Sequence, residues 1–513
     1  MQRGAFTVSG WTIFPAAATS RVEVRLGGQP LGLAQLGVAR PDLEGRSASN
    51  DAILAGFTLS ADLTSWPGTD GPVTLETEAV SVDGERYELS PVELLLAPAP
   101  VPPAATARQR TVATRLSGRR LLVCTHQLCL GGASRYLLET LEALIRAGAA
   151  APVVLSPIGG PLQPYLEELG IPVHVSGPMP LDDPEALDGR VEEIAAWAGL
   201  QGFELAFVNT ASPLTLCGAE VARELGIPAV WAIHESFEPP VLWGNLVPEV
   251  RRRMEEVLGE AALAVFEADA TRRIYEPLLP GRCLTVPYGL DLRAIDELRA
   301  GFDRDAARRR LSVPPDAELI ICVGVIEPRK AQASLAQAFD LIAERHPKAR
   351  LALVGAEETA DSEALARWVE SSRLAGRIEL VPSTPEVQQW YGVADLLVCA
   401  SRIESLPRAV LEAMAWELPV LSTAIFGLPE LIDDGSTGWL CEPGDTRALA
   451  DALERVLAID PAERRRVGVA ARQLVETRHD LDGYATRVAQ LFDQAVAGPT
   501  GARGARPGNP TAS

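Results

Sequence analysis

The segment DLLVCASRIESLPRAVLEAMAW, residues 395–416, decides the fold class. It begins with an apolar run at 396–399, continues through a polar loop, and ends in a segment with helical spacing at 409–416. A strand this apolar is buried on both faces of its sheet, which is typical of parallel sheets covered by helices. The segment therefore predicts one strand–loop–helix unit of an α/β fold.

The same pattern recurs on both sides of this segment, from residue 119 to about residue 480. The other apolar runs of strand length lie at 121–123, 152–155, 205–208, 229–233, 319–323 and 351–354. They predict two doubly wound, Rossmann-like domains at 119–290 and 291–480, followed by a C-terminal helix at 481–497. In such sheets ligands bind beyond the carboxyl ends of the strands, so the loops after the runs are where chemistry is expected.

Residues 1–97 have a different period, in which apolar and polar residues alternate. Val22, Val24 and Leu26 alternate with charged residues, and similar runs follow with turn residues between them. This pattern predicts a small all-β sandwich that serves as an accessory module. A carbohydrate-binding sandwich is the alternative, to which Trp11 and Trp66 would contribute stacking faces.

Two segments lack any apolar period. Residues 98–118, rich in Pro and Ala, predict an extended linker, and residues 498–513, rich in Gly and Pro, predict a disordered tail. Arginines at 108, 110, 115, 119 and 120 make the linker region locally basic. Contact with an anionic lipid surface therefore stays open as an alternative to a plain solvated hinge.

The composition excludes several classes of protein. A net charge of −21 argues against nucleic-acid binding, which needs a basic face. Neither a run of 18 apolar residues nor an apolar leader is present, so we expect a cytoplasmic protein, with peripheral contact at the inner membrane face as an alternative. The seven cysteines include no C-x-x-C pair, which argues against a disulfide scaffold or a structural zinc site.

Three of the strand-end loops carry glycines, a histidine or cations. Gly131 and Gly132 open a helix, where backbone N–H groups could approach an anion, although a plain helix entry has the same sequence. His234 could face a substrate hydroxyl or cap the next segment. Arg329 and Lys330 place two cations where a bound diphosphate would need them, or they form a solvated pair.

The loop after 396–399 holds the most specific signal, two glutamates at E-x7-E spacing. Glu404 is expected in the loop and Glu412 about one turn inside the helix, because Pro407 suits the first helical turn. Both carboxylates could then face one cleft and accept hydrogen bonds from sugar hydroxyls, while the helix N-terminus faces phosphate.

Taken in order, these motifs resemble those of the retaining glycosyltransferases of family 4, which have the two-domain GT-B fold. The likeness runs from residue 121 to about 480 and is carried by Gly131-Gly132, His234-Glu235, Val286 to Asp291, Glu327 to Lys330, Glu404 to Glu412 and Gly427 to Glu430. It implies transfer of a sugar from a UDP- or GDP-type nucleotide sugar to a glycan or lipid-linked acceptor, with retention at the anomeric carbon. The family context implies bacterial surface polysaccharide assembly.

The resemblance also implies roles for single residues. Gly131 and Gly132 would approach the donor diphosphate, and His234 would contact the transferred sugar near the reacting carbon. Lys330, with Arg329 assisting, would neutralise the leaving diphosphate.

The resemblance gives the E-x7-E region three tasks. Glu404 would hold sugar hydroxyls, and Glu412 would bind the nucleotide ribose. The backbone N–H groups near Ser405 and Leu406 would meet phosphate. The residues expected to be catalytic are therefore His234, Lys330 and Glu404.

Some positions depart from the family pattern. Val325 replaces a common arginine, Ser405-Leu406-Pro407 replaces Gly-Phe-Gly, and Glu417 and Phe426 replace glycines. These changes leave the identity of the donor open.

Neither a metal ion nor another cofactor is expected. Glycosyl transfer builds negative charge on the leaving phosphate, which a metal held by Asp-x-Asp after a strand could stabilise. Asp303-Arg304-Asp305 has this spacing, but it lies in a charged helical stretch and follows no apolar run. Two other functions stay open, a phosphorylase or epimerase with the same fold and a non-catalytic sugar-binding scaffold.

Overall fold

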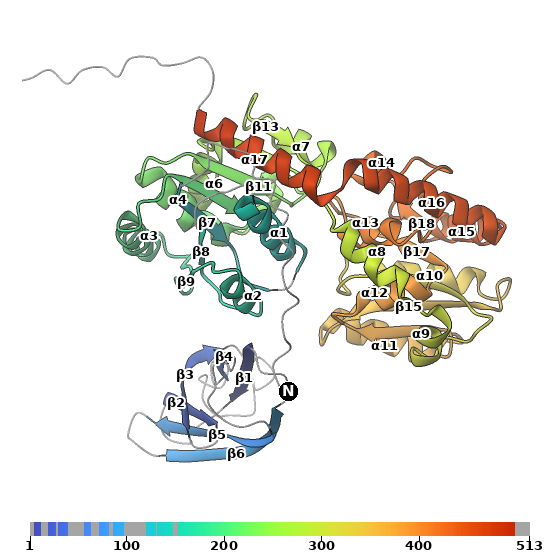
Figure 1. Cartoon of the computed structure of the whole chain (residues 1–513), viewed down its shortest axis with the longest axis horizontal. Helices are drawn as coiled ribbons and strands as arrows, with labels where there is room; N and C mark the ends of the chain where they lie inside the picture. The colour runs from blue at the N-terminus through green and yellow to red at the C-terminus, as the bar shows by residue number, and fades with distance from the viewer. Residues whose placement is uncertain are drawn as a thin grey trace, which may run out of the picture. The chain divides into compact units, whose positions relative to one another are not determined.

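The computed structural model describes residues 5–11, 19–26, 29–38, 56–62, 71–81, 86–96, 119–129, 131–146 and 152–497, which fall into two compact units (Figure 1). The linker predicted at 98–118, the tail predicted at 498–513, and Trp66 lie outside the described residues. Within these ranges, no helix is both long enough and apolar enough to cross a membrane.

The first unit contains six antiparallel strands, and the short helix α2 (Gln163–Glu168) groups with it. The strands are β1 (Ala5–Trp11), β2 (Thr19–Leu26), β3 (Gln29–Val38), β4 (Gly56–Asp62), β5 (Gly71–Ser81) and β6 (Arg86–Leu96). They pair in the order β1-β4-β3-β2-β5-β6. The all-β character agrees with the alternating pattern. A sandwich also needs a second packed sheet, and that part remains a prediction.

The second unit begins with a domain built on a seven-stranded parallel sheet, which we call the acceptor-side half after the role that the resemblance implies for it. Its strands are β7 (Leu121–Thr125), β8 (Pro152–Ser156), β9 (Val173–Val175), β10 (Leu205–Asn209), β11 (Ala229–Ile233), β12 (Leu263–Phe266) and β13 (Cys283–Thr285). The order β13-β12-β11-β10-β7-β8-β9 reverses between β10 and β7. Such a reversal opens a crevice at the carboxyl ends of the strands, where ligands bind.

Helices cover both faces of this sheet. They are α1 (Gly132–Arg146), α3 (Pro184–Gly199), α4 (Leu216–Glu224), α5 (Pro239–Leu242), α6 (Pro248–Gly259) and α7 (Asp269–Tyr275). The α1 helix follows β7 directly, so its N-terminus lies at the reversal point.

The following domain is built on a six-stranded parallel sheet, and we call it the donor-side half, again after the role that the resemblance implies. Its strands are β14 (Glu318–Val323), β15 (Ala349–Ala356), β16 (Ile378–Pro382), β17 (Leu396–Cys399), β18 (Val420–Thr423) and β19 (Trp439–Cys441). The order β16-β15-β14-β17-β18-β19 reverses between β14 and β17. The prediction of two doubly wound, Rossmann-like parallel sheets is confirmed.

In the described residues, ten helices come after β13, the last strand of the acceptor-side half. They are α8 (Leu292–Ala300), α9 (Arg304–Arg310), α10 (Gln332–Ile342), α11 (Ala360–Ser371), α12 (Val387–Val393), α13 (Arg408–Ala415), α14 (Leu428–Leu431), α15 (Thr446–Leu457), α16 (Pro461–Arg478) and α17 (Leu481–Ala497). Pro407 is the N-cap of α13, with φ −68° and ψ 119°, and not a residue of its first turn as expected. Extended backbone suits the residue before a helix, and proline tolerates it.

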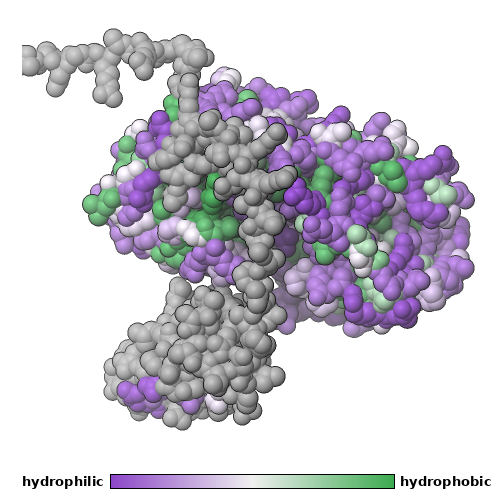
Figure 2. All heavy atoms as spheres, viewed as in Figure 1, coloured by the Kyte–Doolittle hydropathy of each residue, from purple (hydrophilic) through white to green (hydrophobic). Residues whose placement is uncertain are grey.

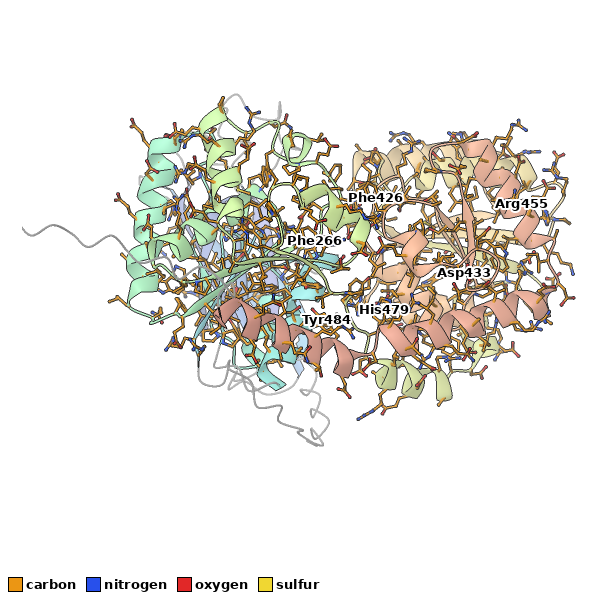
Figure 3. The ribbon with its side chains drawn as sticks, turned by 90° about the horizontal axis from the view of Figure 1, so that it is seen from above. Phe266, Phe426, Asp433, Arg455, His479 and Tyr484 are labelled. Atoms are coloured by element: carbon orange, nitrogen blue, oxygen red, sulfur yellow. The ribbon has the colours of Figure 1, made fainter. Side chains whose placement is uncertain are left out.

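The last helix returns to the acceptor-side half. Figure 1 shows α17 beside α1, and the hydroxyls of Tyr484 and Thr140 lie 2.6 Å apart across this contact. The chain passes between the two halves twice, once near Tyr288 and once near His479, which precedes α17 (Figure 3). Nδ1 of His479 lies 2.9 Å from the carbonyl oxygen of Tyr288. The two halves are therefore joined by two adjacent crossings, near 286–291 and 479–481.

Each half has its own hydrophobic core. Trp231 and Phe266 lie in the acceptor-side core, and Phe339 and Leu421 lie in the donor-side core. On the face in Figure 2, the described residues of the second unit are mainly hydrophilic, and the apolar ones are scattered. Scattered exposed apolar residues are ordinary for a folded protein.

Candidate active site

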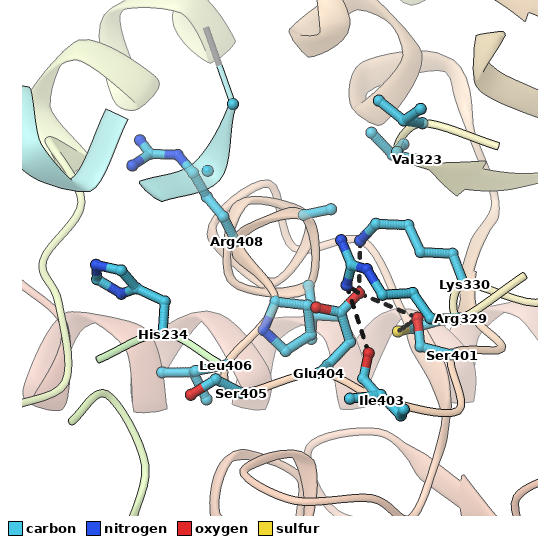
Figure 4. A pocket seen from close by; sticks show the side chains of 18 of the residues that line it. His234, Val323, Arg329, Lys330, Ser401, Ile403, Glu404, Ser405, Leu406 and Arg408 are labelled. Atoms are coloured by element: carbon cyan, nitrogen blue, oxygen red, sulfur yellow. Dashed lines mark hydrogen bonds and ion pairs between the residues drawn. The ribbon is translucent and has the colours of Figure 1, made fainter. Parts of the chain in front are cut away.

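A cavity of about 580 Å³ lies where the loops after β7, β11, β14 and β17 meet (Figure 4). Its lining includes all the residues predicted to be catalytic or substrate-binding, namely Gly131, Gly132, His234, Arg329, Lys330, Glu404, Ser405, Leu406 and Glu412. The strand-end rule explains this convergence, because parallel strands bring their carboxyl ends to one edge. The individual roles of these residues remain predictions.

Glu404 lies at the centre of a cluster of donors. Lys330 Nζ is 2.5 Å and Arg329 Nη1 is 3.3 Å from Glu404 Oε1. The Ser401 hydroxyl donates to the same oxygen over 3.2 Å. Burial alone would lower the pKa of Lys330, but the nearby Glu404 charge outweighs burial and raises it. The ammonium group therefore stays charged throughout the neutral range.

The β14–α10 loop has a backbone shaped around the lysine side chain. Gly324 has φ +139°, and a Cβ there would lie 3.0 Å from Lys330 Cδ. Glycine adopts this φ without strain and leaves room for the lysine stem. Ala331 then takes a left-handed conformation, φ 55°, as the N-cap of α10. The loop thereby directs Lys330 toward Glu404.

His234 is held at both ring nitrogens. Nδ1 lies 2.8 Å from Glu267 Oε1, and Nε2 lies 2.9 Å from Asn209 Oδ1. The Asn209 amide nitrogen donates to the Ala133 carbonyl over 3.1 Å, which fixes its oxygen toward the histidine. Both partners of the ring are acceptors, so both hydrogen bonds form together only when both ring nitrogens donate, and the arrangement favours the imidazolium.

The environment of His234 favours this charged form. Burial would lower the pKa of His234, but the charge and hydrogen bond of Glu267 and the charge of Glu235 raise it above the ordinary value. Tyr136 meets the ring edge-on, with centroids 4.5 Å apart. The ring therefore has a fixed orientation on the acceptor-side wall of the cavity.

Glu412 is also engaged by side-chain donors. Arg408 Nε is 2.7 Å from its Oε1, and the Tyr391 hydroxyl donates to Oε2 over 2.9 Å. Arg408 also reaches across to α1, where its Nη1 lies 2.7 Å from Glu139 Oε2. A carboxylate has about four lone-pair positions, so Glu412 can still accept hydroxyl groups.

The glycines at the start of α1 leave the helix end open. A Cβ on Gly132 would meet no atom within 4 Å. No acidic residue lies in the first turn, and Arg135 faces the cavity from this turn. Within the described residues, Arg135 has no carboxylate partner. This end of α1 thus presents N–H groups and a cation to the cavity.

The Asp303–Asp305 segment has a structural task. The Asp303 side chain caps α9 by accepting from the Ala306 amide over 2.9 Å, and Asp305 is exposed. In the ranges given above, no three His, Cys, Asp or Glu side chains are grouped as metal ligands would be.

Several lining and supporting residues escaped the sequence analysis. Asn209 ends β10 and Glu267 follows β12, so the strand-end rule could have indicated both. Tyr391 and Glu139 lie within helices, and only their three-dimensional neighbours reveal them. Arg408 stands between the two glutamates in the sequence, but its partner Glu139 lies in the other half.

Two family profiles match the second unit. The profile described as Glycosyltransferase Family 4 matches residues 130–294, and the profile described as glycosyl transferases group 1 matches residues 303–474. A relative named D-inositol 3-phosphate glycosyltransferase, from Actinosynnema mirum, is 31% identical over 363 residues, covering 65% of this chain and 85% of the relative. A relative of the same name from Thermomonospora curvata is 29% identical, covering 66% and 85%.

Solved structures share the fold of the second unit. Anabaena HepE in complex with UDP-glucose is 20% identical, with a TM-score of 0.62, and the alignment covers 73% of this chain and 99% of HepE. WaaG, a glycosyltransferase involved in lipopolysaccharide biosynthesis, is 17% identical, with a TM-score of 0.57 and coverage of 72% and 99%. At these identities the likeness shows the fold alone.

Proposed function

The chain belongs to the family of group 1 and family 4 glycosyltransferases, and from this premise we propose that it moves a sugar from a UDP-sugar to an acceptor hydroxyl with retention at the anomeric carbon. The observation that carries the proposal is the convergence of Lys330 and Arg329 on Glu404 at the cavity. In a nucleotide sugar the sugar is bonded directly to the diphosphate. A site for it therefore needs a carboxylate for the sugar hydroxyls next to cations for the phosphates.

The chemistry assigns each group a part. The bond between the anomeric carbon and the phosphate oxygen breaks, and negative charge grows on the departing phosphate. Lys330, Arg329 and the amide groups before α13 stabilise that charge more in the transition state than in the ground state. The acceptor oxygen bonds to the same carbon on the same face, and its proton leaves with the product phosphate.

The donor is proposed as a UDP-sugar because of a solved relative in fold. HepE binds UDP and UDP-glucose in its structures, and the alignment covers 73% of this chain and 99% of HepE. In this chain Glu412 would receive the ribose hydroxyls, with its carboxylate oriented by Arg408 and Tyr391. The resemblance also allows a GDP-sugar as donor, so GDP-sugars are tested beside UDP-sugars.

For the acceptor we propose a phosphorylated polyol. The relatives reported above are named for D-inositol 3-phosphate, and not for a surface polysaccharide. Arg135 supports this choice, because it brings a cation without a carboxylate partner among the described residues to the acceptor-side wall. A glycan or lipid-linked acceptor, with peripheral membrane contact, is the alternative from the resemblance.

The test uses the purified full chain. UDP- and GDP-sugars are screened by thermal shift, and the stabilising donor is then incubated with D-inositol 3-phosphate or a lipid-linked glycan. We expect nucleoside diphosphate release that depends on the acceptor, and a product whose anomeric configuration by NMR matches the donor.

Three outcomes would contradict the proposal. If no nucleotide sugar raises Tm, the donor assignment is wrong. An inverted product would overturn retention. Reversible breakdown of a glycan by inorganic phosphate would favour a phosphorylase instead.

A further inference from the structure

Three buried hydroxyl groups join the two halves beside the cavity. Ser236 follows β11, Thr271 lies on α7, and Ser405 lies in the loop before α13. Their exposed fractions are 5%, 0% and 6%. Thr271 Oγ1 lies 2.7 Å from Ser236 Oγ and 3.0 Å from Ser405 Oγ. Ser405 is a departure from the family pattern, in which a glycine would offer no hydroxyl.

The hydroxyl protons give this chain of contacts a direction. The Ser236 hydroxyl donates to the Glu404 carbonyl over 3.2 Å, which uses its only proton. Thr271 must therefore donate to Ser236, and Ser405 must donate to Thr271. The chain begins at Ser405 and ends at the carbonyl of the residue before it, so two side chains of the acceptor-side half hold one peptide unit of the donor-side loop.

This hold fixes the direction of an amide group. The carbonyl and the N–H of a trans peptide point in opposite directions, so the Ser405 N–H points away from Ser236. The next peptide is held in the same way, because the Gly427 amide donates to the Ser405 carbonyl over 3.1 Å. In the described part of the chain, the amides of Ser405 and Leu406 meet no acceptor. Both residues line the cavity.

We propose that Thr271 is a positioning residue for transfer, which acts through Ser236 and Ser405 to aim the Ser405 amide at the leaving diphosphate. The inference rests on the proposed function. Thr271 and Ser236 belong to the acceptor-side half, so this hold on the Glu404–Ser405 peptide exists only while the two halves are in contact. The hydroxyl chain thereby couples closure of the halves to stabilisation of the leaving group.

The test compares two substitutions at Thr271 that differ in the hydroxyl. Thr271→Val keeps the shape and removes the hydroxyl, whereas Thr271→Ser keeps it. We expect Thr271→Val to lower kcat by about 10- to 100-fold, as for a misplaced transition-state contact, with KM for the UDP-sugar changed much less. Thr271→Ser should recover most of kcat.

A matched control separates positioning from folding. Thr215 is also a buried threonine of the acceptor-side half, its hydroxyl donates to the Ser212 carbonyl over 2.7 Å, and neither residue lines the cavity. Thr215→Val should lower Tm to a similar extent and leave kcat unchanged.

A double-mutant cycle tests the path. Ser405→Ala removes the first donor of the chain, so its effect and that of Thr271→Val should not add in kcat. Additive losses, or a folded Thr271→Val protein with the kcat of the parent, would overturn the inference while leaving the glycosyltransferase assignment intact. A parent protein that uses no nucleotide sugar would overturn the proposed function, and this inference with it.

Discussion

Nδ1 of His234 lies 2.8 Å from Oε1 of Glu267, and this contact favours the charged form of the imidazole on the acceptor-side wall of the cavity. Both side chains are nearly buried, with 12% and 10% of their surfaces exposed. An imidazolium in this position can favour negative charge on a departing phosphate, but it cannot act as a base. The pair therefore makes activity depend on the protonation of His234.

We predict that kcat/KM falls on the alkaline side as His234 loses its proton. The pKa of His234 is raised above its ordinary value of 6.5, since Glu267 and Glu235 outweigh burial. Because the folded state binds this proton more tightly, its contribution to stability is complete below the unfolded pKa and is lost as pH rises through the folded pKa. Glu267→Gln should move the alkaline limb to lower pH.

The measurement is a pH profile of kcat/KM for the parent and the Glu267→Gln protein. Glu256→Gln is the control, because Glu256 forms an exposed pair with Arg252 on α6. An alkaline limb at the same pH in all three proteins would contradict the imidazolium assignment.

Lys330→Ala is predicted to lower turnover by on the order of 10²- to 10³-fold, the usual cost of losing one preorganised transition-state donor. The chain contains only two lysines, so Lys348→Ala is a natural control. Lys348 is exposed, its Nζ lies 3.7 Å from Asp316 Oδ2, and neither residue lines the cavity. Steady-state kinetics on both variants, with Tm measured for each, decides the role of Lys330. Equal turnover in the two folded variants would refute it.

The sequence predicted the centre of each parallel sheet better than its edges. The apolar run 205–208 became β10, Leu205–Asn209, because a central strand is buried on both faces and shows no alternation. The edge strands β9 and β13 are only three residues long and partly exposed, so they lack an apolar run. The return of α17 to the acceptor-side half depends on contacts such as that of Tyr484 with Thr140, which no local pattern encodes.

The candidate site shows the same division. His234, Lys330 and Glu404 lie in the loops that follow β11, β14 and β17, and the topology of a parallel sheet places these loops at one edge. The Thr271–Ser405 contact and the Arg408–Glu139 ion pair each join the two halves, so they depend on how the halves meet. Sequence periodicity carries no information about that arrangement.

Glu404 and Glu412 are predicted to act on different parts of the donor. Glu412→Gln should weaken binding of both UDP and the UDP-sugar, because its carboxylate would hold the ribose that both ligands share. Glu404→Gln should leave UDP binding nearly unchanged and impair transfer, since Glu404 would hold the sugar, while its partners Lys330 and Arg329 would meet the diphosphate. Calorimetry with both ligands measures this, and equal losses for both ligands in both variants would contradict the division.

Arg408→Leu extends this prediction. Arg408 orients Glu412 through a 2.7 Å contact, so its loss should reproduce part of the UDP-binding defect of Glu412→Gln. The two effects should not add in the double variant, because both act on one carboxylate. Additive losses would indicate that Arg408 contacts the nucleotide independently of Glu412.

The positive charge of the cavity is partly neutralised by its own carboxylates. The cationic groups Arg329 and Lys330 both lie on Glu404, and Arg329 also lies 2.7 Å from Glu327. In the proposed function, the donor diphosphate would therefore be met by directed donors, namely these cations, the Ser405 and Leu406 amides, and the N-termini of α1 and α13. Each helix N-terminus contributes about half a positive charge.

On this argument, transfer is predicted not to need a divalent ion, because preorganised donors stabilise developing charge by their placement and not by net charge alone. The measurement is the initial rate of UDP release with excess EDTA, compared with the rate in added magnesium or manganese. We expect the two rates to differ by about twofold at most, a much smaller change than the fall in rate caused by losing one preorganised donor. A rate that collapses in EDTA and returns with metal would show that the donors around Lys330 do not suffice, and that a cation bound with the donor supplies the missing charge.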